Sequence, residues 1–408
     1  MLNAIWLFFF ISAFLAACVQ LALGDVTIFT TLVTALFEMA KLAFDISLGL
    51  VGVLCFWMGI LKIGEAAGLI HWLSRCLSPL FRRLMPDVPR NHPAFGHISM
   101  NLAANMLGLD NAATPVGIKA MKSLQSINPS QDTASNAQIL FLVLNTSAVT
   151  LFPVTIIMYR LQQGAVAPAE IFVPILIATA ASTLAGLIAV AWCQGLKLWD
   201  RVIAMYAGGA ALLLGGFIFM LARLPSDQLS TVSTLIGNGA LFSLIIAFMV
   251  SASTKRVNVY EHFIEGAKEG FNIALTILPY LLAMLVAIGV FRASGLMDFT
   301  VAGLRWVFEA LHMNTAFVDA LPTALMKPLS GSGSRALMLE LMHSQGVDSF
   351  AAKVAATIQG STETTFYVLA VYFGAVGIQK IRHALACGLV ADAAGIITAI
   401  AVGYWFFG

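Results

Sequence analysis

The sequence contains little charge. Charged residues make up only 10% of its 408 residues, whereas an ordinary soluble domain carries about 25%. Hydrophobic residues account for 60%. A soluble protein of this length could not bury so much apolar surface. The composition therefore predicts an integral membrane protein, with the lipid bilayer as its surroundings.

Several chemical signatures are also missing from the sequence. The five cysteines stand apart, without a C-x-x-C pair or a Cys/His cluster, so neither a disulfide framework nor a metal site is indicated. The H-E-x-x-H and G-x-S-x-G motifs are absent, and we expect neither an enzyme nor a cofactor. No basic stripe with interleaved aromatic residues indicates a nucleic-acid partner.

Nine apolar segments are long enough to cross a bilayer, because a membrane helix needs about 20 residues. The segments cover about residues 3–23, 42–62, 136–159, 170–194, 203–222, 235–251, 271–291, 351–375 and 383–406. Residues 26–41 either form another helix or extend the second one. The first segment lacks a basic start and a good cleavage site, so we expect a retained helix rather than a signal peptide.

Two further apolar stretches, residues 92–121 and 315–343, are interrupted near their middles by small and polar residues. Each stretch is long enough to enter the bilayer and return as two half-helices. Irregular backbone at membrane depth survives only where protein or a wet cavity satisfies its hydrogen-bonding groups. We therefore predict a broken or re-entrant helical hairpin in each stretch.

One order of elements occurs twice, over residues 42–194 and 271–406: a helix, an amphipathic connector, a broken hairpin and two helices. Fourteen of the 22 lysines and arginines fall in connections that face the cytoplasm if the N-terminus does, which fits the positive-inside rule. The two repeats are then inverted, as in secondary transporters. We expect an all-α polytopic fold with domains at residues 1–195 and 203–408.

The first hairpin contains two asparagines, Asn101 and Asn105, that share one helix face because they lie four residues apart. Their amides suit a polar solute, although such amides also hold membrane helices together. Gly108 and Pro115 bracket the expected break. Between them lie two candidates for binding a coupling ion, Asp110 and Asn111.

The second hairpin contains the peptide PLSGSGSR, residues 328–335. Its glycines allow a backbone to approach a ligand closely, and a half-helix that starts there presents N–H groups and a positive dipole end. We therefore predict that Ser330, Ser332 and Ser334 lie near a solute. A flexible exterior loop is the alternative.

Each hairpin is followed by a helix that carries polar residues. The first of these helices contains Asn145 and Ser147, and the second contains Thr362 and Glu363. A carboxylate within a membrane helix is costly and by default functional. The partner of Glu363 is a solute, a coupling cation or Arg335. Asp392, in the last apolar segment, is a further ion-coupling candidate, with a structural role equally open.

Residues 101–115, 328–335 and 359–365 resemble motifs of the nucleoside recognition (Gate) domains. More closely, the chain looks like the spore maturation protein A and B families fused, with the A-like part at about residues 1–195 and the B-like part at about 230–408. More distantly it is similar to concentrative nucleoside transporters. That similarity implies substrate roles for Thr362, Glu363 and the three hairpin serines. It implies substrate or cation roles for Asn101, Asn105, Asn145 and Ser147.

Together, these patterns predict a secondary transporter of the bacterial inner membrane that binds a small polar solute between the two hairpin tips. The solute is nucleoside-like, or an amino-acid or carboxylate metabolite. Coupling to H⁺ or Na⁺ is expected because no ATP-binding motif is present. The alternative is a sensor or scaffold that binds a solute without transporting it. The resemblance leaves a homo-oligomer open.

Overall fold

The computed structural model describes residues 2–89, 91–107, 110–148, 150–196 and 200–408, and within these ranges the chain forms helices joined by turns and loops, with one isolated β-bridge. The expected all-α fold is confirmed. The helices are α1 (Leu2–Ala22), α2 (Ile28–Ala66), α3 (Leu69–Leu84), α4 (Ala94–Met106), α5 (Asp110–Gln125), α6 (Asn136–Thr146), α7 (Val154–Gln162), η1 (Pro168–Ile171), α8 (Phe172–Gln194), α9 (Arg201–Leu221), α10 (Ser226–Thr254), α11 (Val259–Ala293), α12 (Leu296–Ala310), η2 (Val318–Ala320), α13 (Leu321–Met326), α14 (Gly331–Gln345), α15 (Phe350–Ser361), α16 (Thr365–Gly374) and α17 (Ala384–Phe407).

Seven helical segments of the described chain are long and apolar enough to cross a membrane: α1, α2, η1 with α8, α9, α10, α11 and α17. Their outer faces are apolar and exposed, as Leu212 and Leu213 of α9 illustrate at 78% and 79% exposure. Such surfaces are stable in lipid rather than in water. The chain is therefore a multi-pass membrane protein. Residues 26–41 extend the second span, since α2 is continuous from Ile28.

Two of the nine expected spans are not continuous helices, and the prediction was wrong there. The segment at 136–159 divides into α6 and α7, and the segment at 351–375 divides into α15 and α16. We call residues 147–153 the first break and residues 362–364 the second break. Ala148 has a positive φ of 43°, and Pro153 precedes α7 without an N–H to donate. Thr362 is extended, as its β-branched side chain favours.

The two interrupted stretches do contain the expected breaks. In the first hairpin, α4 ends at Met106 and α5 begins at Asp110. Pro115 lies inside α5, so the expectation that it borders the break was wrong; near a helix start it removes one hydrogen bond without splitting the helix. In the second hairpin, Ser330 caps α14 by accepting a hydrogen bond from the Gly333 N–H at 3.0 Å. Ser330 and Gly333 are buried, which argues against an exterior loop.

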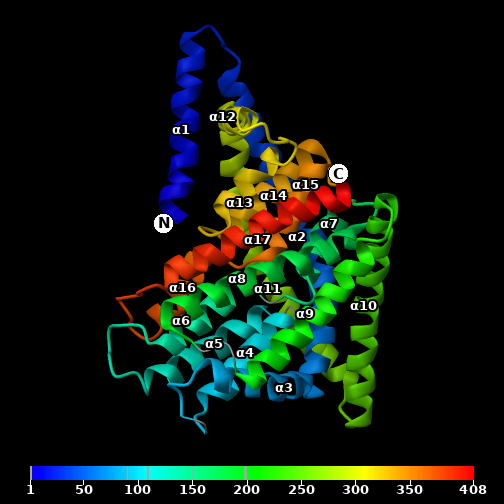
Figure 1. Cartoon of the computed structure of the whole chain (residues 1–408). Coiled ribbons are helices and arrows are strands. Elements are labelled where there is room, and N and C mark those ends of the chain that lie inside the picture. The colour runs from blue at the N-terminus through cyan, green and yellow to red at the C-terminus, as the bar shows by residue number, and fades with distance from the viewer. Residues whose placement is uncertain (1, 90, 108–109, 149, 197–199) are drawn as a thin grey trace.

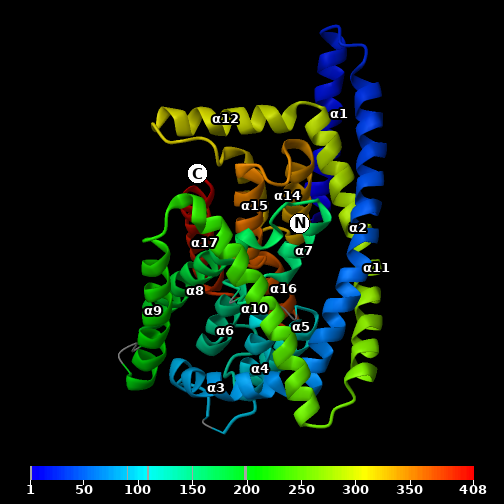
Figure 2. The same ribbon diagram turned by 90° about the vertical axis from the view of Figure 1, so that its right-hand side faces the viewer.

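The long helices α2 and α11 form an antiparallel pair that runs through the whole molecule (Figure 2). Their backbones approach closely at glycines of α11. A Cβ on Gly266 would lie 2.3 Å from the Met58 carbonyl oxygen, and one on Gly270 would lie 2.5 Å from that of Leu54. Small residues at such positions allow membrane helices to pack without a hydrophobic driving force.

The helices around this pair repeat in order. A connector follows each long helix, and Figure 2 shows the two connectors, α3 and α12, at opposite ends of the molecule. A hairpin and a broken helix follow each connector, and α8 and α17 then complete the two sequences. Figure 1 shows α17 packed along α8, while α1 and the start of α2 extend beyond the other helices. The hairpins and broken helices of both halves therefore lie inside a frame of continuous helices.

A buried ion-pair network also joins the two halves. Arg160 of α7 is fully buried and contacts Glu170 at 2.5 Å and Asp348 at 3.0 Å. Glu170 also accepts from Lys353 of α15 at 3.1 Å. Two cations thus compensate two carboxylates, which is the condition for burying charge without a large loss of stability.

We predict that Gly270→Ala lowers the free energy of unfolding by about 1–3 kcal/mol, because the added methyl group would overlap the α2 backbone. Gly52→Ala is the matched control, since Gly52 lies on α2 with open space around its Cα. The control should be neutral or raise stability by up to about 1 kcal/mol through helix propensity. Unfolding of the purified protein in detergent measures both. Equal stabilities of the two variants would contradict the close packing.

Candidate functional site

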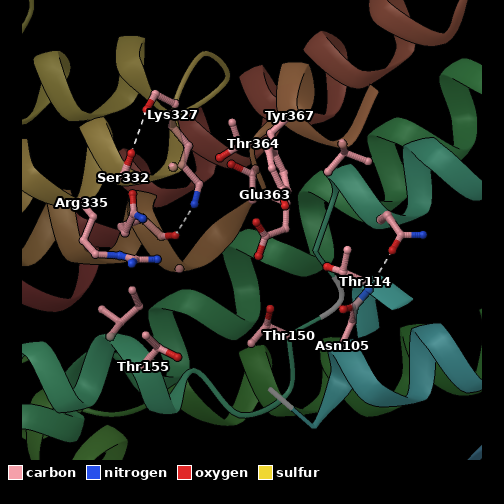
Figure 3. A pocket seen from close by; sticks show the side chains of 18 of the residues that line it. Asn105, Thr114, Thr150, Thr155, Lys327, Ser332, Arg335, Glu363, Thr364 and Tyr367 are labelled. Atoms are coloured by element: carbon pink, nitrogen blue, oxygen red, sulfur yellow. Dashed lines mark hydrogen bonds between the residues drawn. The ribbon is translucent and has the colours of Figure 1, made fainter. Parts of the chain in front are cut away.

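The candidate site is a cavity of about 560 Å³ where both hairpins and both breaks meet (Figure 3). Polar residues from all four segments line it, and aromatic rings of α11 and α16 complete the wall. The lining consists of Asn105, Thr114, Asn145, Thr150, Phe152, Pro153, Val154, Thr155, Ile156, Tyr280, Lys327, Leu329, Ser330, Gly331, Ser332, Arg335, Gln359, Gly360, Thr362, Glu363, Thr364, Tyr367, Val368, Val371 and Tyr372.

Backbone hydrogen bonds hold the breaks in place, and the same bond occurs in each half. The Leu151 N–H donates to the Met106 carbonyl at 3.1 Å, and the Phe366 N–H donates to the Pro328 carbonyl at 3.0 Å. Each broken helix is thereby fixed to the end of the first arm of its own hairpin. Protein groups thus satisfy backbone that the breaks expose, as membrane depth requires.

A third backbone bond joins the second break to the end of α6. The Glu363 N–H donates to the carbonyl of Thr146, the last residue of α6, at 2.8 Å. The position of Glu363 therefore depends on the end of a helix in the other half of the chain. A displacement of α6 would move the carboxylate directly.

Glu363 is half-buried and points into the cavity (Figure 3). Within the described ranges, its carboxylate has neither a hydrogen bond nor an ion pair, so the alternative in which Arg335 is its partner is not formed. Arg335 reaches toward the same space from α14, with its guanidinium carbon 5.4 Å from the centroid of the Tyr159 ring. One carboxylate and one guanidinium thus face a common volume in a low-dielectric setting, where each interacts strongly with a polar ligand.

Two amides on the opposite wall are held by a hydrogen-bond network. Asn105 Nδ2 donates to Asn145 Oδ1 at 2.9 Å, and the Tyr372 hydroxyl donates to the same oxygen at 3.3 Å. Asn145 Nδ2 donates to the Phe141 carbonyl at 2.9 Å. Asn101, behind this wall, donates to the Tyr372 hydroxyl at 3.3 Å. The network fixes the orientation of the Asn105 and Asn145 amide groups at the cavity wall.

Six of the residues selected from sequence line the cavity: Asn105, Asn145, Ser330, Ser332, Thr362 and Glu363.

Three others lie behind the wall. Asn101 also donates to the Ala113 carbonyl at 2.8 Å, Ser147 Oγ donates to the Leu144 carbonyl at 3.2 Å, and Ser334 Oγ donates to the Thr323 carbonyl at 2.8 Å. All three are buried. Their bonds stabilise the hairpins and the end of α6, so each supports the cavity from outside rather than facing it.

Of the ion-coupling candidates, Asp392 does not line the cavity. Asp392 is buried on α17, where its Oδ2 accepts from Thr365 Oγ1 at 2.5 Å. The side chains of Asp110 and Asn111 lie outside the part of the chain that the structure describes.

Sequence reasoning overlooked Lys327 and the tyrosines. Lys327 is only 3% exposed, and its Nζ donates to the Gln359 carbonyl near the end of α15 at 2.9 Å. A lysine inside an apolar stretch is as costly as a glutamate, so the same criterion that selected Glu363 could have found it. The rings of Tyr280, Tyr367 and Tyr372 gave no such signal, because aromatic residues are common in membrane helices.

Comparison with known proteins supports the repeated organisation. A family model described as Gate, nucleoside recognition, matches residues 47–162 and 274–379. These two segments contain both hairpins, both breaks and every residue of the cavity lining.

Two relatives from Bacillus subtilis (strain 168) are similar to parts of the chain. Spore maturation protein B is 44% identical over 170 residues, which cover 41% of this chain and 94% of that protein. Spore maturation protein A is 41% identical over 188 residues, which cover 46% of this chain and 93% of that protein. Each relative is thus matched over nearly its full length by less than half of this chain. The resemblance to Gate domains and to spore maturation proteins A and B is confirmed.

We predict that Asn145→Ala destabilises the protein by about 1–3 kcal/mol, because it removes the acceptor of the half-buried Asn105 amide and of the buried Tyr372 hydroxyl. Tyr372→Phe is the matched variant. In it, Asn145 Oδ1 still accepts a hydrogen bond from Asn105, and Asn101 still donates one to the Ala113 carbonyl. Its cost should be only about 0.5–1.5 kcal/mol. Unfolding in detergent ranks the two, and the opposite ranking would show that the network does not centre on Asn145.

Proposed function

We infer the function from the premise that this chain belongs to the Gate family of nucleoside recognition domains, whose model matches more than half of its residues. We propose that it is a secondary transporter that moves a small polar solute across the inner membrane, driven by an ion gradient. The observation that carries the proposal is the cavity itself. Both hairpins and both helix breaks wall it, and the Glu363 carboxylate, which has no partner among the described residues, faces it. Broken helices that meet at a polar site are the architecture of secondary transporters.

The two halves act as inverted-topology repeats with re-entrant hairpins in this proposal, residues 1–195 forming one domain and 203–408 the other. The antiparallel α2–α11 pair and the placement of α3 and α12 at opposite ends support it. So do the two corresponding backbone bonds from the broken helices to the hairpins. Alternating access then consists of a movement of the hairpins and broken helices against the frame of continuous helices.

The solute that fits best is nucleoside-like. Tyrosine rings on α11 and α16 offer flat apolar surfaces for a base, while Glu363 and the hydroxyls of Ser332 and Thr364 can hydrogen-bond a sugar. The description of the family as nucleoside recognition supports this class. An amino-acid metabolite is the second candidate, because Glu363 and Arg335 face one volume and would match an amine and a carboxylate.

The proposed orientation follows from charge. Arg83 of α3 lies 3.5 Å from Asp200 at the start of α9, and Lys255 at the end of α10 donates to the carbonyl of Ala67, between α2 and α3. These contacts collect basic residues at one end of the frame. By the positive-inside rule this end faces the cytoplasm, and the proposal puts the start of α1 toward the same side of the membrane, because α1 and α2 run in opposite directions.

The decisive variant is Glu363→Gln, which keeps the shape of the side chain and removes its charge. We expect solute binding on the order of ten- to a hundredfold weaker, the cost of losing a hydrogen bond to a charged group. Glu309→Gln on the exposed face of α12 is the matched control and should bind as wild type does. The measurement is thermal stabilisation in detergent against nucleosides and amino acids, because ligands of the folded state raise the unfolding temperature.

Flux into liposomes then separates transport from binding alone. Uptake of the stabilising solute under an ion gradient, lost in Glu363→Gln, is the expected result. Binding without flux would replace the transporter with the sensor or scaffold that shares the same cavity. Identical solute binding by wild type and Glu363→Gln would show that the Glu363 carboxylate does not bind the solute.

A further inference from the structure

We propose that the protein binds a sodium ion at a second site, behind the cavity, formed by Asp392 together with the hydroxyls of Thr146, Ser182 and Thr362. Its role as the coupling ion rests on the transport function proposed above. Binding of the ion itself does not, and it can be measured without any solute.

The site is marked by buried oxygens without partners. Asp392 and Thr362 are each 2% exposed, and Thr146 and Ser182 are fully buried. Asp392 Oδ1 and the three hydroxyl oxygens have no hydrogen-bond partner among the described residues. An unsatisfied buried polar group costs roughly 1–3 kcal/mol, and buried side-chain polar atoms are normally paired. Four such groups around one helix indicate a missing ligand.

One face of α17 places these residues around Asp392. Asp392 lies on this face between Gly388, four residues before it, and Gly395, three residues after it. A Cβ on Gly395 would lie 2.6 Å from Thr362 Cγ2 and 3.2 Å from Ser182 Cβ.

At the other end of the same face, a Cβ on Gly388 would lie 3.6 Å from Thr146 Cγ2 and 2.9 Å from Thr365 Cγ2. Thr146, Ser182 and Thr362 therefore flank the Asp392 carboxylate on both sides. They come from the end of α6, from α8 and from the second break, and α17 packs against the helices α6, α8, α15 and α16.

The donor set favours a monovalent cation over a proton. Asp392 Oδ2 already accepts from Thr365 Oγ1 at 2.5 Å, which leaves Oδ1. A protonated carboxyl would donate one hydrogen bond and could satisfy only one of the three hydroxyls. A cation takes several oxygen ligands at once. A single carboxylate among hydroxyls carries too little negative charge for the divalent ions, which usually bind to more carboxylates.

The helix ends favour a cation at the same place. Thr146 is the last residue of α6, and Thr362 follows the last residue of α15, so two helix C-termini meet near Asp392. Each carries a negative partial charge that attracts a cation, and broken helices of transporters use these ends to bind Na⁺.

The ion site adjoins the solute cavity, because Thr362 belongs to both. Thr362 precedes Glu363, whose N–H is bonded to the Thr146 carbonyl. An ion held by Thr146 and Thr362 would fix the second break and with it the direction of the carboxylate. Sodium should therefore raise the affinity for the solute, and the solute should raise the affinity for sodium by the same factor.

The test measures the unfolding temperature of the full chain in detergent, without solute, as NaCl replaces choline chloride at constant ionic strength. Wild type should gain a saturable rise with Na⁺. In Asp392→Asn, the Na⁺ concentration for the half-maximal rise should increase at least about tenfold, the lower range for losing a group that supports a metal. Asp45→Asn on the exposed face of α2 is the matched control and should respond as wild type does.

Two milder variants guard against a folding defect. Ser182→Ala and Thr362→Val each remove a hydroxyl that lacks a partner. Without Na⁺ both should unfold at the wild-type temperature or above it, and both should need several-fold more Na⁺ for the half-maximal rise. Wild-type Na⁺ responses in both variants would overturn the site.

Other outcomes are equally clear. If added choline chloride raised the unfolding temperature as much as added NaCl does, the effect would be one of ionic strength and the proposal would be overturned. Stabilisation that follows pH instead of Na⁺ and disappears in Asp392→Asn would assign a proton in place of sodium. Na⁺ binding without any solute binding would keep the ion site and remove the transporter. Solute binding and flux without a Na⁺ response would keep the transporter and overturn the sodium site.

Discussion

Backbone groups at membrane depth must find partners within the protein, and this constraint shapes the centre of the molecule. Two helices break in the described chain at residues 147–153 and 362–364, and N–H groups from both breaks bond to carbonyls of other segments. Breaks and hairpins are therefore stable only as a group. The polar cavity is the space left between these hydrogen-bonded segments, and the surrounding helices separate it from lipid.

The two halves are alike in backbone and different in chemistry. The bonds of Leu151 to Met106 and of Phe366 to Pro328 correspond. Yet the second half supplies Glu363, Lys327 and Arg335 to the cavity, whereas the first supplies amides and hydroxyls. A symmetric frame thus holds an asymmetric set of charges. The first half orients a ligand through fixed dipoles, and the second binds it through charge.

Hydropathy alone predicted the membrane class and seven of the spans, because each is a continuous apolar run. It failed at residues 136–159 and 351–375, since apolar composition is the same in a whole and a broken helix. The breaks depend on distant partners such as the Thr146 carbonyl, which no local pattern reveals. The cost of burying a charge selected Glu363, which lines the cavity, and the same argument applies to Lys327. The placement of Ser147 and Ser334 behind the wall depends on rotamers and neighbours that spacing does not encode.

The bond between Glu363 and Thr146 also has a consequence for biogenesis. The four half-helices are at most 12 residues long, or about 18 Å at 1.5 Å per residue, too short to cross the hydrocarbon core alone. When α6 leaves the ribosome, the residue that completes its C-terminus has not been synthesised. The first half must therefore wait in the bilayer with its polar segment held in water or by insertion machinery. Assembly of the centre is a late event, set by the arrival of α15 and α16.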